Sequence, residues 1–199
     1  RHTLYSVSKT FVGVAVGLAI DENRLRLTDR VATFFPEMMP DSISVNLAAM
    51  TVRDLLTMTS GVTPDWNMRN VQEHWLKYFF GKPVQKPGVE FKYDSMASYV
   101  LSAIVQRVTG MKVIDYLNKK VFSVLNINDA EWECSPEGIS AGGWGLRLSA
   151  LSMAKFGQLL LDKGRWNGVQ VVSEEWVRLM MSEQQVTGDG GFYGFHIWK

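Results

Sequence analysis

Cysteine and histidine are scarce in this sequence of 199 residues. Cys134 is the single cysteine, so the chain can form no internal disulfide. The three histidines, His2, His74 and His196, are far apart and form no HExxH or Cys/His pattern of the kind that binds zinc. We therefore expect no structural or catalytic zinc site. We also expect no other metal and no organic cofactor.

The chain also lacks an excess of charge and a long apolar run. Lys and Arg total 21 against 20 Asp and Glu, which leaves a formal net charge of +1. Nucleic acids and anionic membranes attract a concentrated basic excess, so we expect neither as a partner. The longest apolar stretch, residues 11–20, falls well short of the roughly 18 residues that a bilayer span requires. It predicts a buried helix and no transmembrane segment.

What remains is the composition of a globular protein, with 46% hydrophobic and 12% aromatic residues. The length fits one domain or one and a half. Periodicity and capping residues predict helices over 6–22, 51–61, 96–108, 113–124, 149–162 and 173–182. We expect residues 62–89 to be irregular, Asn167-Gly168 to form a hairpin turn, and the tail over 188–199 to begin a strand.

The first predicted helix is apolar on nearly every face, which is typical of a helix buried inside a domain. Gly13 and Gly17 are four residues apart and therefore lie on one face of it. Because glycine has no side chain, we expect another element to approach the helix closely there.

The sharpest motif is Ser6-Val7-Ser8-Lys9, an S-x-x-K at the start of this helix. Residues three apart are neighbours on a helix surface, so the Ser6 hydroxyl and the Lys9 amine can meet. Apolar surroundings lower the pKa of a lysine, which can then accept the proton of a serine nucleophile. The alternative interpretation makes Ser6 or Ser8 a helix cap and Lys9 a solvated first-turn lysine.

A second candidate, Tyr93-Asp94-Ser95, lies where an extended piece meets a predicted helix. A tyrosine near a lysine ammonium can have a lowered pKa and act as a base or proton relay, and Ser95 offers a short polar contact. The alternative is a packed tyrosine followed by a cap, formed by Asp94 or Ser95, that has no chemical role.

Five segments in order carry a resemblance to a known family: YSVSKTF, MTVRDLLTMTSGV, FKYDSMASYVLSAIVQRVTG, GGWGLRLSALSMAKFGQLLLDKGRWNGVQVVSEEWV and YGFHIW. Together they resemble the serine β-lactamase and penicillin-binding-protein superfamily over essentially the whole chain. Within it, the sequence is most similar to the class C-like serine hydrolases, which include esterases, D-aminopeptidases and 6-aminohexanoate-dimer hydrolases.

This resemblance implies an α/β (α+β) fold of the β-lactamase/transpeptidase type, with residues 1–199 forming a single domain. It implies that Ser6 is acylated, that Lys9 accepts its proton, and that Tyr93 assists as a third catalytic residue. It also implies substrate-binding roles for Ser95, the third member of the tyrosine motif, and for Gly143 and Trp144, which would line the cleft.

Two departures from the family pattern concern the ends of the chain. The third motif, K-T-G or H-x-G on a strand, has no match, since Val186-Thr187-Gly188 lacks the cation. Only five residues precede Ser6, whereas the family has strands there. We therefore expect a fragment with a largely complete helical lobe and an antiparallel-sheet lobe truncated at both ends, which is inactive in isolation if the missing strands are essential.

The sequence thus predicts a serine hydrolase that acts on an ester, an amide or a lactam through an acyl-enzyme on Ser6. A small molecule or a peptide is the expected substrate. The YDS motif and the short GGWG connection favour an esterase or amidase over a true β-lactamase. The alternative from another class is a catalytically silent protein of the same fold that binds or senses a ligand.

Overall fold

The computed structural model describes residues 1–71 and 73–199, and the chain folds as helices packed around one central helix, with small antiparallel sheets at the edges. The helices of the described part are α1 (Ser8–Asp21), α2 (Val45–Ala49), α3 (Val52–Leu56), α4 (Trp75–Phe80), α5 (Ser95–Thr109), α6 (Val113–Leu117), α7 (Ala150–Leu161) and α8 (Glu174–Met180). The strands are β1 (His2–Thr3), β2 (Glu131–Trp132), β3 (Leu146–Leu148), β4 (Arg165–Trp166), β5 (Val169–Gln170), β6 (Gln185–Val186) and β7 (Phe192–Tyr193). This mixture of helix and sheet confirms the predicted fold class.

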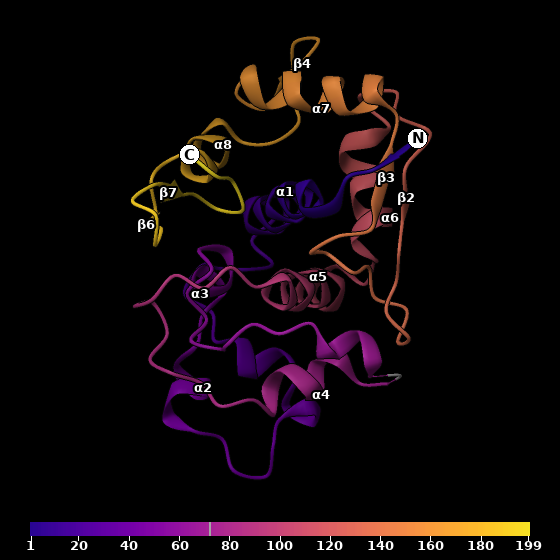
Figure 1. Ribbon diagram of the computed structural model, residues 1–199. Helices are drawn as coiled ribbons and strands as arrows, with labels where there is room; N and C mark the ends of the chain where they lie inside the picture. Colours follow the sequence, from indigo (N-terminus) through magenta and orange to yellow (C-terminus); the bar gives the residue numbers. More distant parts are fainter. Residues whose placement is uncertain (72) are drawn as a thin grey trace.

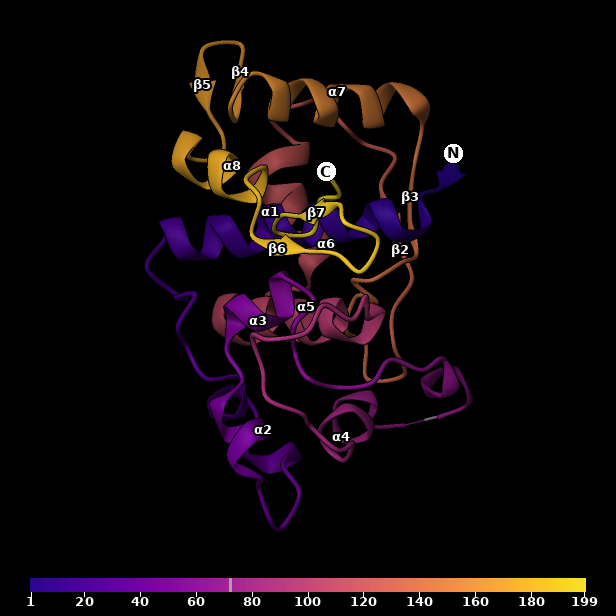
Figure 2. The ribbon, with the colours of Figure 1, turned by 60° about the vertical axis from the view of Figure 1, so that its left-hand side comes forward.

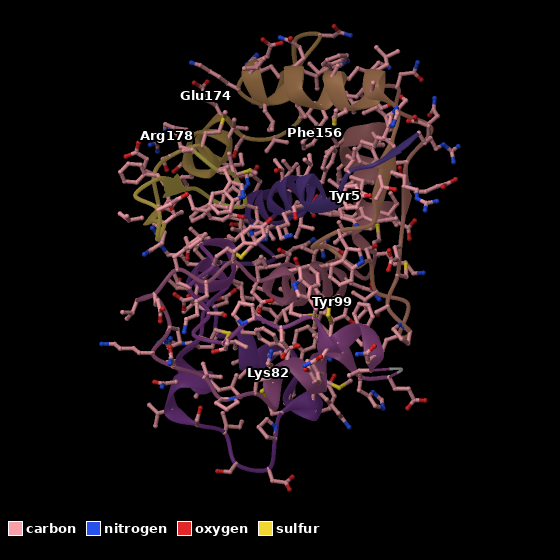
Figure 3. All side chains as sticks on the ribbon, in the orientation of Figure 1. Tyr5, Lys82, Tyr99, Phe156, Glu174 and Arg178 are labelled. Atoms are coloured by element: carbon pink, nitrogen blue, oxygen red, sulfur yellow. The ribbon has the colours of Figure 1, made fainter. Side chains whose placement is uncertain are left out.

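The apolar helix α1 runs through the middle of the molecule, between α7 on one side and α5 on the other (Figures 1 and 2). Residues 11–19 of α1 are all buried, as its apolar sequence predicts. Phe11 stacks on Phe156 of α7 with 3.7 Å between ring centroids, and Figure 3 shows Phe156 lying between the two helices. Within the described residues, no helix is both long and apolar enough to cross a membrane.

A three-stranded antiparallel sheet in the order β1-β3-β2 fixes the entry to α1. Thr3 pairs with Arg147, and Arg147 also pairs with Glu131 on the other side. The Leu4 N–H continues the ladder by donating to the Leu146 carbonyl over 2.8 Å. The residue that begins the S-x-x-K motif is therefore held two positions beyond a sheet.

Several local predictions are confirmed by the backbone. Asn167 and Gly168 form the β4–β5 turn with φ values of +46° and +83°, which the primed hairpin turns require. Thr51 and Asp54 form a reciprocal capping box at α3. Asp94 rather than Ser95 caps α5, since its side chain accepts the Met96 N–H over 2.8 Å.

Other local predictions are wrong. The segment over 62–89 contains helix α4, which buries Trp75 and Phe79 in the core. His74, the residue before this helix, has a left-handed backbone conformation. Residues 45–49 form helix α2 where no helix was expected. The helix predicted over 113–124 is α-helical only as far as Leu117 and continues as a π-helical turn, Asn118–Phe122. Helices α2 and α4, of 5 and 6 residues, are too short to show a clean periodicity, and tertiary burial decides their conformation.

The close approach predicted at Gly13 and Gly17 is made by α8. The Trp176 indole lies across α1, and its Nε1 donates to the Gly13 carbonyl over 3.0 Å. A Cβ atom built on Gly17 would lie 2.1 Å from the indole ring, far inside van der Waals contact. The glycine therefore sets the distance between the two helices.

We expect Gly17→Ala to lower the free energy of unfolding by about 1–3 kcal/mol, because the added methyl group forces the buried indole out of place. Urea denaturation of the parent and the variant measures this. Gly157→Ala is the matched control, since Gly157 lies in α7 with open space around its Cβ position. That variant gains helix propensity and should be more stable by about 0.5–1 kcal/mol. Equal stabilisation by both substitutions would contradict the packing account.

Candidate active site

Ser6 and Lys9 lie at the start of α1 in two very different environments. Ser6 is exposed, in a 3-10 turn (Tyr5–Val7) that leads into the helix, whereas Lys9 is 1% exposed. Neither Ser6 nor Ser8 caps the helix with its side chain. The Ser8 side chain is instead buried, and its hydroxyl accepts the Leu146 N–H. The interpretation of Lys9 as a solvated lysine is therefore wrong.

The Lys9 amine is surrounded by three oxygen atoms at hydrogen-bond distance. Its Nζ donates to Ser6 Oγ over 3.2 Å, to Ser95 Oγ over 3.0 Å and to the Gly143 carbonyl over 2.7 Å. It also lies 4.7 Å from the centroid of the Tyr93 ring. The structure thus brings together four of the predicted site residues around one nitrogen, from segments up to 134 residues apart.

Burial lowers the pKa of Lys9 from 10.5 to about 8. Removing the ammonium from water disfavours its charged form, and the nearby negative charge of Asp94 offsets part of this effect. A substantial fraction of Lys9 is therefore neutral slightly above pH 7 and can accept a proton.

Tyr93 reaches the site from the segment that precedes α5, and its ring packs against Trp198 with 5.3 Å between centroids. Burial raises the pKa of Tyr93, while its neighbours Ser6 and Trp198 offset part of this rise. The expectation of a lowered pKa is wrong, because the desolvation of the phenol outweighs its hydrogen bonds with Ser6 and Trp198. Tyr93 is a neutral phenol at physiological pH and can donate a hydrogen bond.

Gly143 approaches Lys9 as closely as it does because it has no side chain. A Cβ atom built on it would lie 2.5 Å from the Ser95 carbonyl oxygen, in the first turn of α5. Any other residue would push the loop that precedes β3 away from α5 and lengthen the contact between Lys9 and the Gly143 carbonyl. The role that the geometry gives Gly143 is therefore to position the amine.

Trp144 lies next to Gly143, and its side chain is buried. The indole is 6% exposed, packs against Trp75 with 5.7 Å between centroids, and donates to Glu133 Oε1 over 3.1 Å. Its backbone carbonyl accepts the Trp132 Nε1–H over 2.7 Å. Trp144 thus joins the loop to α4, and its role in substrate binding stays a prediction.

Sequence reasoning missed Asp94 and His196 as parts of the site. Asp94 is buried beside Tyr93 and Ser95, and burial raises the pKa of its carboxyl to about 6. His196 is buried between Leu56, whose carbonyl lies 3.1 Å from Nδ1, and Ser98, whose hydroxyl lies 3.0 Å from Nε2. Burial, together with the charge of Lys9, lowers the pKa of His196 to about 3.

A neutral His196 fits its two contacts, with Nδ1 donating to Leu56 and Nε2 accepting from Ser98. Its ring therefore holds the C-terminal segment against α3 and α5 and does not contact Ser6. His2 and His74 are exposed. The only signal in the sequence was the place of His196 between apolar residues, Phe195 and Ile197.

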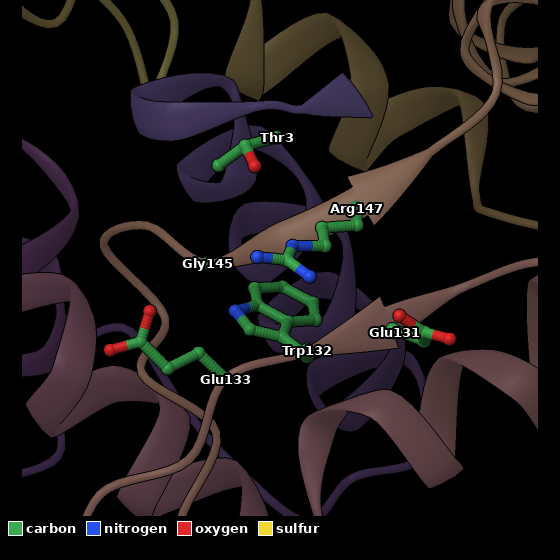
Figure 4. Close-up of a pocket in the computed structure, with 6 residues that line it drawn as sticks. All are labelled: Thr3, Glu131, Trp132, Glu133, Gly145 and Arg147. Carbon is green, nitrogen blue, oxygen red and sulfur yellow. The ribbon is translucent and has the colours of Figure 1, made fainter. Parts of the chain in front are cut away.

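A separate pocket opens on the β1–β3–β2 sheet (Figure 4). It is lined by Thr3, Glu131, Trp132, Glu133, Gly145 and Arg147. The hydrogen-bond partners of the Lys9 amine, Ser6, Ser95 and Gly143, are not among these residues, so this pocket is distinct from the Ser6–Lys9 site. Across residues 1–71 and 73–199, His, Cys, Asp and Glu side chains form no group of three that could hold a metal ion.

Comparison with known proteins places this geometry in a family. The family model described as Beta-lactamase matches residues 1–198. A 6-aminohexanoate-dimer hydrolase of Paenarthrobacter ureafaciens is 28% identical, over 96% of this chain and 54% of the relative. Protein flp of Staphylococcus aureus (strain N315) is 26% identical over 67% of this chain and 28% of its own length. The chain thus spans about half or less of the length of these relatives.

Two solved structures share the fold. A Bacillus anthracis protein described as a candidate 6-aminohexanoate-dimer hydrolase superposes with a TM-score of 0.85 at 20% identity, over 99% of this chain and 58% of its own. An octameric penicillin-binding protein homologue from Pyrococcus abyssi gives 0.78 at 21% identity, over 99% and 53%. At these identities the likeness concerns the fold alone. With the family model matching all but the last residue, this chain belongs to the Beta-lactamase family.

Proposed function

We propose that this chain carries the catalytic serine of a hydrolase that forms an acyl-enzyme on Ser6, with Lys9 as the proton acceptor. The observation that carries the proposal is the buried Lys9 amine, with a lowered pKa, 3.2 Å from the hydroxyl of an exposed serine. A structural lysine gains nothing from such a place, because a buried ammonium loses its hydration. A general base is most effective when its pKa lies near the working pH, and burial brings the pKa of Lys9 to that range.

Acylation follows from the three contacts of Lys9. Neutral Lys9 has two N–H bonds and one lone pair; the N–H bonds point to Ser95 Oγ and to the Gly143 carbonyl, which leaves the lone pair for the Ser6 hydroxyl. As Ser6 Oγ attacks the substrate carbonyl, its proton passes to Lys9. The resulting ammonium has three acceptors at hydrogen-bond distance, so the proton transfer needs no rearrangement.

Two further groups assist this step. The Ser6 backbone N–H, at the start of the helical turn, is the candidate donor to the developing oxyanion. Tyr93, a neutral phenol beside Ser6, donates a proton or hydrogen bond to the leaving group and is recharged from the Lys9 ammonium. Water then attacks the acyl-enzyme, and Ser6 regains its proton as the acid is released.

Esters and linear amides are the substrates that we propose. The relative at 28% identity is named for the hydrolysis of a 6-aminohexanoate dimer, and a structural neighbour from Streptomyces sp. is described as a D-stereospecific amidohydrolase, with a TM-score of 0.78. The YDS motif and the short GGWG loop in this chain support the same choice over lactams. A silent binding protein would not need a base of lowered pKa at its serine.

Ser6→Ala should abolish covalent labelling of the intact protein by a fluorophosphonate, because the variant has no hydroxyl to attack phosphorus. Intact mass spectrometry before and after the reagent reads the adduct. Ser8→Ala is the matched control from the same motif; Ser8 is buried and bonded to the Leu146 N–H, so this variant should still be labelled. Equal labelling of the Ser6 variant and the parent would exclude Ser6 as the nucleophile, and an unlabelled parent would favour the silent binder.

The acylation rate should rise with pH, about tenfold per unit, and level off above a pKa of about 8, because the neutral form of Lys9 is the active one. Stopped-flow measurement of the acylation rate between pH 5 and 10 tests this. Lys9→Arg should lose at least about a thousandfold in rate at every pH, because a guanidinium does not release its proton in this range. A pH-independent rate, or an active Lys9→Arg variant, would contradict the role of Lys9.

A further inference from the structure

Tyr5, the residue directly before the nucleophile, has a backbone conformation that is unfavourable for its type. Its φ is +46°, in the left-handed region that glycine and asparagine adopt more readily than an aromatic residue. Such strain persists only where the surrounding structure enforces it, and it is concentrated at functional sites. The same region is occupied by three asparagines, whose type suits the conformation, and by four other residues of the described chain: Asn23, Asn126 and Asn167, and Met58, His74, Lys163 and His196.

The backbone on both sides of Tyr5 is firmly held. The Leu4 N–H donates to the Leu146 carbonyl over 2.8 Å, and the Val7 N–H donates to the Leu4 carbonyl over 3.0 Å. These bonds fix the turn that presents Ser6, and they account for the positive φ. They do not account for an aromatic side chain, because the Tyr5 ring is 73% exposed and gains little from packing. Figure 3 shows Tyr5 at the N-terminal end of α1.

Other exposed apolar side chains lie around the same serine. Val7, at the end of the 3-10 turn, is 49% exposed, whereas residues 11–19 of α1, the helix that follows, are all buried. Trp198 is 53% exposed and lies 5.3 Å from the Tyr93 ring, which in turn lies 4.7 Å from Lys9 Nζ. Grouped exposed apolar residues mark binding surfaces more often than isolated ones do. Here Tyr5 and Val7 flank Ser6 in the chain, and Tyr93 connects Trp198 to Ser6 through hydrogen bonds with both.

We propose that Tyr5 is a specificity-determining residue whose ring forms an apolar wall for the acyl chain of the substrate, and that this chain is uncharged and several carbons long. The inference rests on the proposed function, since the group that becomes attached to Ser6 Oγ lies nearest to the residues that flank Ser6. Each methylene group that the ring removes from water should raise the acylation rate by up to about fourfold, the factor equivalent to about 0.8 kcal/mol.

The contact between the Tyr5 ring and the acyl chain can be tested in the intact protein by measuring how fast Ser6 reacts with two fluorophosphonates, one with an ethyl and one with an octyl chain. Ser6 Oγ forms a bond to phosphorus, fluoride leaves and the serine proton passes to Lys9, so no later hydrolysis step enters the measurement. The parent should react at least about tenfold faster with the octyl reagent. Tyr5→Asn, which suits a positive φ, should lower this octyl-to-ethyl ratio by about threefold or more and change the ethyl rate by less than about twofold. Tyr5→Phe should keep the ratio.

Leu161→Asn is the matched control, because Leu161 is similarly exposed, at 72%, at the far end of α7 from β3. It should leave both rates unchanged. An octyl-to-ethyl ratio that is the same in Tyr5→Asn as in the parent, or that falls as far in Tyr5→Phe or Leu161→Asn, would overturn the role of Tyr5. A parent that reacts with neither reagent would instead overturn the proposed function, and the inference with it.

Discussion

The structure depends on one buried amine. Lys9 is placed by its sequence in a helix whose apolar residues belong in the core, and burial would leave its ammonium without water. Oxygen atoms from three segments replace that water: Ser6 in the 3-10 turn before α1, Ser95 at the start of α5, and the carbonyl of Gly143 before β3. Desolvation lowers the pKa of this amine, the negative charge of Asp94 offsets part of the fall, and the balance leaves a pKa of about 8.

The same arrangement buries the proposed base, Lys9, and leaves the proposed nucleophile, Ser6, exposed to solvent. One turn of helix carries Lys9 into the core, while Ser6 remains at the surface, where a substrate can reach it. The β1–β3 ladder holds the turn in front of the serine, and the absence of a side chain at Gly143 lets the loop before β3 close on the amine. Short-range packing therefore sets the distances on which the proposed chemistry rests.

Patterns local in the sequence predicted much of this. The i, i+3 spacing of Ser6 and Lys9 fixes their contact once the helix forms, and the capping residues of α3 and α5 follow local rules. The family resemblance gave Ser95 and Gly143 substrate-binding roles, and their contacts with Lys9 come from the tertiary fold, since spacing says nothing about residues 86 and 134 positions away. The direction of the Tyr93 pKa and the place of His196 were missed, because both depend on burial created by the tertiary fold.

The central claim is that Lys9 is a base with a lowered pKa, and its own titration tests this most directly. The Lys9 side-chain carbons can be followed by NMR in ¹³C-labelled intact protein from pH 6 to pH 11, with the signal assigned by its loss in Lys9→Arg. The account predicts a midpoint near pH 8. A midpoint near 10.5, the ordinary value for a lysine, would contradict it, because Lys9 would then remain an ammonium where the serine needs a base.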